Sequence, residues 1–199
     1  MQAFDLPCPP GLQSVELQPG DIPALQLFFD ANPEYFLAVG GAPAGSNLAK
    51  EEFHELPPAE LSYNRTYYLA FVPTTANEPW RAIAQLTSGL MTAGAFHLGL
   101  FIVATTHHGQ GDARALFASN ERWALGQGAR WLRLGVVAGN ARAERFWTSQ
   151  GFVELRQRHG VATGPRLNSI RVMLKPLAGA TQAEYLALVA RDRPEQTAD

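Results

Sequence analysis

The chain has 199 residues, 46% of them hydrophobic, which suits one domain with a full core and is too short for two ordinary domains. Lys and Arg number 16 against 18 Asp and Glu, a balance that does not favour nucleic acid or an anionic membrane as partner. No signal-peptide pattern or membrane-length apolar run is present. A single cysteine, Cys8, excludes an internal disulfide and a zinc cluster. We expect a soluble, cytoplasmic, metal-free domain.

The first half of the chain predicts helices followed by strands. Apolar residues at helical spacing over 21–37 indicate two short helices, separated at Asn32-Pro33 because a residue before proline disfavours helix. Segments rich in β-branched and aromatic residues then indicate consecutive antiparallel strands. The expected elements are helices within 21–37 and over 49–55, and strands over 66–72, 81–91 and 96–103.

In the second half, helices and strands alternate. An amphipathic helix over 113–125 is ended by Gly126 and Gly128, as glycine often ends helices. The elements expected after it are a strand over 131–137, a helix over 140–150 and strands over 152–155 and 170–174. This order predicts a three-layered α/β (α+β) domain with a mixed sheet. Residues 179–199 are expected to form a short docking helix and a frayed end.

The turn between the strand over 96–103 and the next helix carries the clearest chemical signal. It consists of His108, Gly109, Gln110, Gly111, Asp112 and Ala113. A helix start offers unpaired N–H groups, and glycine lets a diphosphate approach the backbone. Asp112-Ala113 stands where a P-loop needs Gly-Lys-Ser/Thr, and a dinucleotide fingerprint needs a third glycine. The turn therefore indicates a different phosphate site, with an ordinary helix start as the alternative.

These residues resemble the GNAT acetyltransferase superfamily. The pattern His108-x-x-Gly111-x-Ala113, five residues after Val103, is similar to the superfamily's turn Arg/Gln-x-x-Gly-x-Gly/Ala. A second motif of the superfamily matches at Asn140, Ala143, Trp147, Gly151 and Phe152. The resemblance covers about residues 67–177.

The resemblance implies a GNAT fold, with a mostly antiparallel sheet of six to seven strands, helices on both faces and a splay between the fourth and fifth strands. It implies one acetyltransferase domain over 1–178, with acceptor-side helices at about 20–62 and an acetyl-CoA core at about 66–177. The expected reaction moves an acetyl group from acetyl-CoA, as co-substrate, to a primary amine of a small molecule or protein. The sequence leaves the oligomeric state open, with a homodimer as one alternative. The alternatives are a catalytically impaired acyl-CoA-binding regulatory module and a nucleotide-binding protein.

The resemblance also assigns cofactor contacts. The backbone of Phe101, Ile102 and Val103 would bind the pantetheine arm, and amides from His108 to Ala113 would hold the pyrophosphate. Ala143 belongs to the same cofactor site, Asn140 would reach the pantetheine or the acceptor, and Trp147 would flank the thiol.

Two positions depart from the superfamily pattern. His108 replaces the usual Arg or Gln and would bind phosphate in a pH-dependent way. Trp147 stands where many relatives have a tyrosine that protonates the leaving thiolate, and an indole N–H cannot act as that acid. Because a thiolate with a pKa of about 8.5 leaves tolerably without an acid, activity is still expected.

Three residues are candidates for the general base. His97 begins the fourth strand, near where relatives often place a carboxylate, and the ordinary pKa of histidine suits proton transfer; a packed structural role competes with this interpretation. Glu34 and Tyr35 lie in the segment that covers the acceptor pocket in the superfamily, with a helix-stabilising carboxylate and a core ring as alternatives. The sequence contains no motif that names the acceptor.

Overall fold

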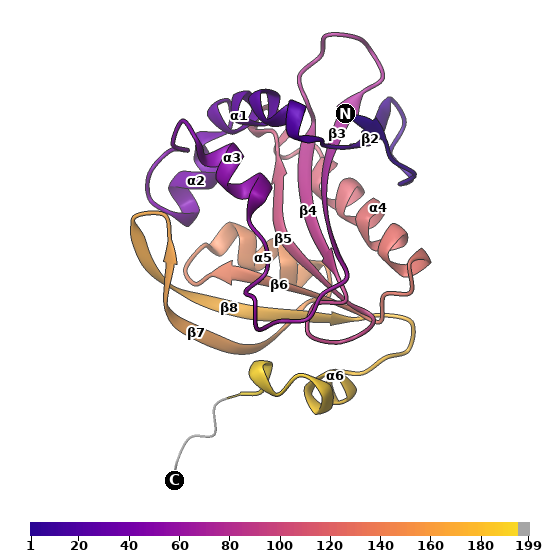
Figure 1. The fold of residues 1–199 in the computed structure, drawn as a ribbon, viewed down its shortest axis with the longest axis vertical. Coiled ribbons are helices and arrows are strands. Elements are labelled where there is room, and N and C mark those ends of the chain that lie inside the picture. Colours follow the sequence, from indigo (N-terminus) through magenta and orange to yellow (C-terminus); the bar gives the residue numbers. More distant parts are fainter. Residues whose placement is uncertain (195–199) are drawn as a thin grey trace.

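The computed structural model describes residues 1–194 and forms one twisted sheet covered by helices (Figure 1). The eight strands lie in the order β1-β2-β3-β4-β5-β6-β8-β7, and only β5 and β6 are parallel. Their bounds are β1 Gln2–Ala3, β2 Leu12–Glu16, β3 Arg65–Pro73, β4 Ala82–Ser88, β5 Ala95–Val103, β6 Trp131–Val137, β7 Val153–Thr163 and β8 Arg166–Pro176. The predicted mixed, mostly antiparallel sheet is confirmed.

Helices cover both faces of the sheet and give the predicted three layers (Figure 1). Their bounds are α1 Ile22–Asp30, α2 Pro33–Val39, α3 Leu48–His54, α4 Asp112–Gly126, α5 Ala141–Ser149 and α6 Gln182–Leu188. On one face, α1, α2 and α3 pack on side chains such as Ile83 and Leu100. On the other face, α4 and α5 pack on side chains such as Leu86 and Leu98.

The sheet is larger than the six to seven strands expected. The missed strands β1 and β2 lie at the sheet edge, and β2 is a five-residue segment that follows Pro9-Pro10-Gly11. Strands β7 and β8 each have 11 residues, well beyond the short apolar runs that predicted them. Their extensions are polar and largely exposed, so they show no apolar periodicity.

Strands β5 and β6 separate partway along their length, as the resemblance implied. Their pairing ends at Leu98 and Leu134, although both strands continue. The register with β4 shifts at this level, which leaves Gly99 as an extra residue in β5. A Cβ at Gly99 would collide with the end of the Gln85 side chain, which would then have to move. Beyond Leu98, main-chain groups of β5 on the β6 side lack a strand partner.

The C-terminal segment docks against the end of the sheet through α6. The indole of Trp131 donates a hydrogen bond to the Thr181 carbonyl at 2.8 Å, and Tyr185 is fully buried. Thr181 and Glu184 form a capping box at the start of the helix. The expected frayed end includes residues 195–199, which lie outside the described residues.

Candidate functional site

The turn before α4 forms an open cradle of backbone amides. Gly109 and Gly111 have φ angles of +79° and +89°, and a Cβ built on either would meet no atom within 4 Å. The amides from Gly109 to Ala113 have no hydrogen-bond partner among the described residues. Because they stand at the start of a 15-residue helix, they offer the donors and the positive dipole that bind an anion.

Basic side chains surround this cradle. It opens into a cavity of about 330 Å³, here called the turn cavity, which Arg114 and Arg142 also line. Neither arginine has an ion-pair partner within residues 1–194. The carboxylate of the turn, Asp112, pairs with Arg81 at 2.7 Å, so its charge is compensated. The turn cavity therefore suits a phosphate group.

His108 lines the turn cavity, and its side chain also contacts the end of β5. Its Nε2–H donates to the Val103 carbonyl at 2.9 Å, and its Nδ1 lies 4.0 Å from a carboxylate oxygen of Glu34. The imidazole thus contacts a carbonyl that was expected to bind pantetheine. The expected phosphate contact of His108 stays a prediction.

Two further cavities lead from the turn into the splay. The middle cavity, of about 380 Å³, shares Val103 and His108 with the turn cavity, and it is also lined by Phe101, Asn140 and Trp147. The splay cavity, of about 210 Å³, lies between β5 and β6 and shares those last three residues. The shared walls make one path from the amide cradle to the separated strands.

Helix α5 supplies one wall of this path. Its N-cap residue, Asn140, accepts a hydrogen bond from the Ala143 amide at 3.2 Å, which fixes the start of the helix. The Trp147 side chain is 9% exposed and packs against four rings at centroid distances of 4.8–5.8 Å. These rings are Phe101, Phe117, Phe146 and Phe152. Trp147 is therefore both a core residue and a wall of the path.

We predict that Trp147→Phe keeps most acetyl-CoA affinity and turnover, because it preserves aromatic packing and the indole supplies no acid. Trp147→Tyr adds the acid that many superfamily members have, and it should change kcat by less than about tenfold if leaving-group protonation does not limit the rate. Steady-state kinetics of both variants test this. A rise of about 100-fold in Trp147→Tyr, worth about 2.7 kcal/mol, would show that the native chain is catalytically impaired.

A fourth cavity, of about 280 Å³, lies next to the splay cavity and shares Gly99 with it. We call it the charged cavity. Its charged and polar lining consists of Glu52, Glu55, Gln85, Thr87, His97, Arg133, Arg158 and Arg191. Helix α3 and the loop after it provide the acidic side, whereas β6, β7 and the C-terminal segment provide the arginines.

The position of His97 argues against its expected role as general base. Its Nδ1 lies 3.1 Å from the Arg133 carbonyl and 3.3 Å from the Arg133 guanidinium. Burial and then the positive charge of Arg133 lower the pKa of His97 to about 3. The ring is neutral near pH 7 and a weak base. The near-neutral pKa expected from its residue type is therefore wrong.

The other two candidates, Glu34 and Tyr35, line the middle cavity and not the charged cavity. Glu34 is 58% exposed in the first turn of α2, which matches its alternative interpretation as a helix-stabilising carboxylate. Tyr35 lines the middle and splay cavities. Burial, followed by the charge of Glu52, raises the pKa of Tyr35 well above its ordinary value, so the phenol stays protonated. Tyr35 can donate a hydrogen bond into the path.

The residue that sequence reasoning missed is Glu52, on α3. Burial, then the charges of Glu55 and Glu51, raise the pKa of Glu52 to about 7. A carboxylate with this pKa, in a cavity that adjoins the splay, is suited to accept a proton near neutral pH. The signal in the sequence is that Glu55 follows Glu52 by three residues, at the end of the segment expected to be helical.

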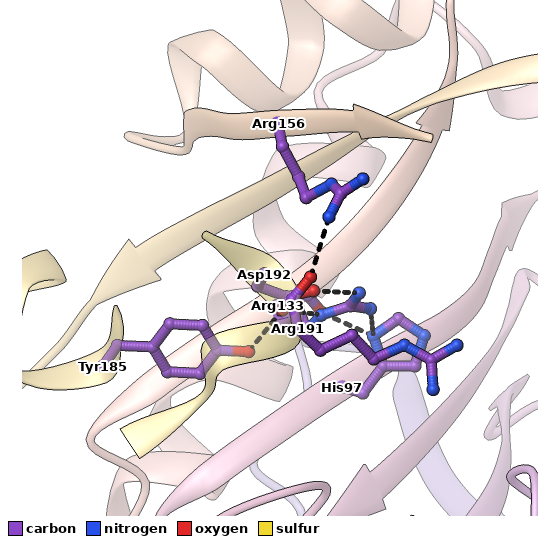
Figure 2. Close-up of polar contacts among 6 residues, drawn as sticks. All are labelled: His97, Arg133, Arg156, Tyr185, Arg191 and Asp192. Carbon is purple, nitrogen blue, oxygen red and sulfur yellow. Dashed lines mark hydrogen bonds and ion pairs between the residues drawn. The ribbon is translucent and has the colours of Figure 1, made fainter. Parts of the chain in front are cut away.

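An ion-pair network holds the basic wall of the charged cavity. Figure 2 shows Asp192 between Arg133 and Tyr185, with His97 beside the guanidinium. Asp192 accepts hydrogen bonds from Arg133 Nε at 2.6 Å, from Arg133 Nη2 at 3.0 Å and from the Tyr185 hydroxyl at 2.7 Å. Burial alone would raise the pKa of Asp192, but Arg133 keeps it below its ordinary value.

A family model and several solved structures match this chain. A family model described as the acetyltransferase (GNAT) family matches residues 18–152. No curated protein sequence matches the chain. Within residues 1–194, no helix is long and apolar enough to cross a membrane, and no group of three or more His, Cys, Asp or Glu side chains could hold a metal ion.

Solved acetyltransferases share the fold. An acetyltransferase from Thermus thermophilus has a TM-score of 0.64 and 23% identity, covering 89% of this chain and 100% of that one. A spermidine N-acetyltransferase from Vibrio cholerae, in complex with CoA and spermine, has a TM-score of 0.61 and 17% identity, with coverages of 88% and 98%. A ribosomal-protein alanine N-acetyltransferase from Escherichia coli has a TM-score of 0.58 and 20% identity, with coverages of 86% and 97%.

Proposed function

Because the chain belongs to the acetyltransferase (GNAT) family, we propose that it transfers the acetyl group of acetyl-CoA to a primary amine. The observation that carries this proposal is the path from the free amides of the turn, through the splay, to the charged cavity. The path suits a long cofactor with phosphates at one end and a reactive thioester at the other. A spermidine N-acetyltransferase of similar fold has been solved in complex with CoA and spermine, which supports a CoA-shaped ligand in this path.

Different residues along the path bind different parts of acetyl-CoA. Amides of Gly109 to Ala113, with Arg114 and Arg142, hold the pyrophosphate and neighbouring phosphates. Main-chain groups of β5 beyond Leu98 bind the pantetheine arm, and Trp147 gives it an apolar wall. The thioester is then placed near Gly99, where the splay cavity and the charged cavity meet.

In the proposed reaction, the Glu52 carboxylate first takes a proton from the ammonium group of the acceptor. The neutral amine nitrogen attacks the thioester carbonyl carbon, a C–N bond forms, and the C–S bond then breaks. The sulfur leaves as a thiolate, which takes up a proton from solvent, and the amine nitrogen releases its second proton to solvent as the amide forms. Glu52 carries out its step at neutral pH because its pKa lies near 7.

Gly111→Val is expected to weaken acetyl-CoA binding by at least about tenfold, because the side chain would project into the turn cavity where the pyrophosphate lies. Isothermal titration calorimetry measures the change. Gly128→Val is the matched control. Gly128 has a φ of +84°, a Cβ there also meets no atom within 4 Å, and it lies just past the other end of α4. Equal affinity in the two variants would show that the cradle is assigned wrongly.

A further inference from the structure

We infer that the acceptor is a small amino carboxylic acid whose amine and carboxylate are separated by several bonds, with the amine at Glu52 and the carboxylate at Arg158. This inference rests on the proposed acetyl transfer and adds the acceptor class. It comes from the two-sided charge of the cavity next to the splay, which places carboxylates on one wall and guanidinium groups on another.

The acidic wall lies on α3 and the loop that follows it. Glu52 and Glu55 both line the charged cavity, and neither has an ion-pair partner within residues 1–194. The pKa of Glu52 responds, after burial, to the other carboxylates Glu55 and Glu51. An ammonium group placed here would relieve this repulsion and form a charge-assisted hydrogen bond. The amine of an acceptor therefore belongs on this wall.

The basic wall has an arginine that lacks a partner. Arg133 is bound to Asp192, and Arg191 lies 3.4 Å from Glu60. Arg158 lines the same cavity and has no ion pair or hydrogen bond through its side chain among the described residues. Burial and then the charges of Arg191, Arg133 and Arg156 lower the pKa of Arg158. An anion bound to Arg158 would offset this repulsion.

The two walls are not in contact with each other. No ion pair joins Glu52 or Glu55 to Arg158 in the part of the chain described, so these charged groups lie more than 4.0 Å apart. An acceptor whose amine and carboxylate are separated by several bonds spans such a gap more readily than a compact α-amino acid. A longer ω-amino acid can place its amine beside Glu52, near Gly99, and its carboxylate on Arg158.

This charge pattern also separates an amino acid from a polyamine. A diamine would place its second ammonium group beside Arg158 and Arg191, where like charges repel. A plain alkylamine would leave the basic wall unpaired. A terminal carboxylate is thus the feature that the basic wall selects.

The experiment compares kcat/KM for three sets of amines of equal chain length: ω-amino acids from four to six carbons, the corresponding alkylamines and the corresponding diamines. Thiol release from acetyl-CoA is the readout. We expect at least one ω-amino acid to exceed its alkylamine and its diamine by about tenfold or more. Arg158→Glu should lower this preference over the diamine by about 100-fold or reverse it, and Arg158→Gln should give an intermediate value.

Arg145→Glu is the matched control, because Arg145 is exposed on α5 and lines none of the four cavities. It makes the same change in net charge and should leave the preference unchanged. The acceptor class would be overturned if the wild-type protein preferred diamines or alkylamines. It would also be overturned if Arg158→Glu and Arg145→Glu showed the same preference. In both cases the proposed acetyl transfer would stand. Binding of acetyl-CoA without thiol release for any amine would overturn the proposed function itself, and this inference with it.

Discussion

Asp192→Ala is expected to lower the free energy of unfolding by about 3 to 5 kcal/mol, because it leaves the Arg133 charge buried without its partner. The Asp192 side chain is completely buried, and that of Arg133 is only 10% exposed. The substitution also removes the acceptor of the Tyr185 hydroxyl. Urea denaturation of the variant and the parent at pH 7 measures the difference.

Two further variants distinguish the stability effect of the buried ion pair from that of an exposed ion pair. Glu60→Ala removes the exposed partner of Arg191 and should change stability by less than about 1 kcal/mol. Adding Arg133→Met to Asp192→Ala should restore much of the lost stability, since the unpaired charge is then gone. A loss below about 1 kcal/mol in Asp192→Ala would contradict the view that this pair holds the C-terminal segment.

Glu52→Gln should reduce kcat/KM by about 10² to 10⁴-fold, the range measured for loss of a general base. In the parent, kcat/KM should rise as pH increases through about 7, because only the ionised Glu52 accepts a proton. The variant should lose this inflection. Glu51→Gln is the control, since Glu51 is exposed on the same helix and lines none of the four cavities; it should keep the inflection, at a lower pH because the Glu51 charge helps to raise the pKa of Glu52. An unchanged inflection in Glu52→Gln would exclude Glu52 as the proton acceptor.

The same pKa has a consequence for stability. The pKa of Glu52 in the folded chain, about 7, is above its ordinary value of 4.5. The protonated Glu52 side chain therefore contributes fully to the free energy of unfolding below pH 4.5, and this contribution is lost as pH rises toward 7. Glu52→Gln, which cannot ionise, should be more stable than the parent at pH 8 by about 1 to 2 kcal/mol, whereas the two should converge at low pH. Such a gain in stability with a loss of activity is typical of a site residue.

The turn before α4 and the start of α5 could be predicted because they depend on local sequence. Gly109 and Gly111 mark a left-handed turn at a helix start, and the spacing from Asn140 to Phe152 follows from one helix and the strand after it. The break at Asn32-Pro33 likewise follows from backbone restriction at proline. In each case, residues close in sequence determine the geometry.

The charged cavity could not be predicted, because it depends on contacts between distant residues. Arg133 and Asp192 are 59 residues apart and come together only when α6 docks on the sheet. The pKa of His97 lies below its ordinary value because the ring is buried and because the charged Arg133 lies beside it on the next strand of the sheet. The pKa of Glu52 depends on burial, and the sequence of the seven-residue helix α3 does not show which of its residues are buried. The polar extensions of β7 and β8 were missed for a different reason: they pair in a local hairpin, but their exposed polar residues show no apolar periodicity.

The most direct test of acetyl transfer is the rate of CoA thiol release from acetyl-CoA with and without an amine, with mass spectrometry of the amine product. The proposed function predicts that thiol release depends on the amine and matches the amount of N-acetylated product. If acetyl-CoA stabilises the protein against heat, yet no amine in a broad panel raises thiol release above the amine-free rate, the chain is an acyl-CoA-binding module and not a transferase.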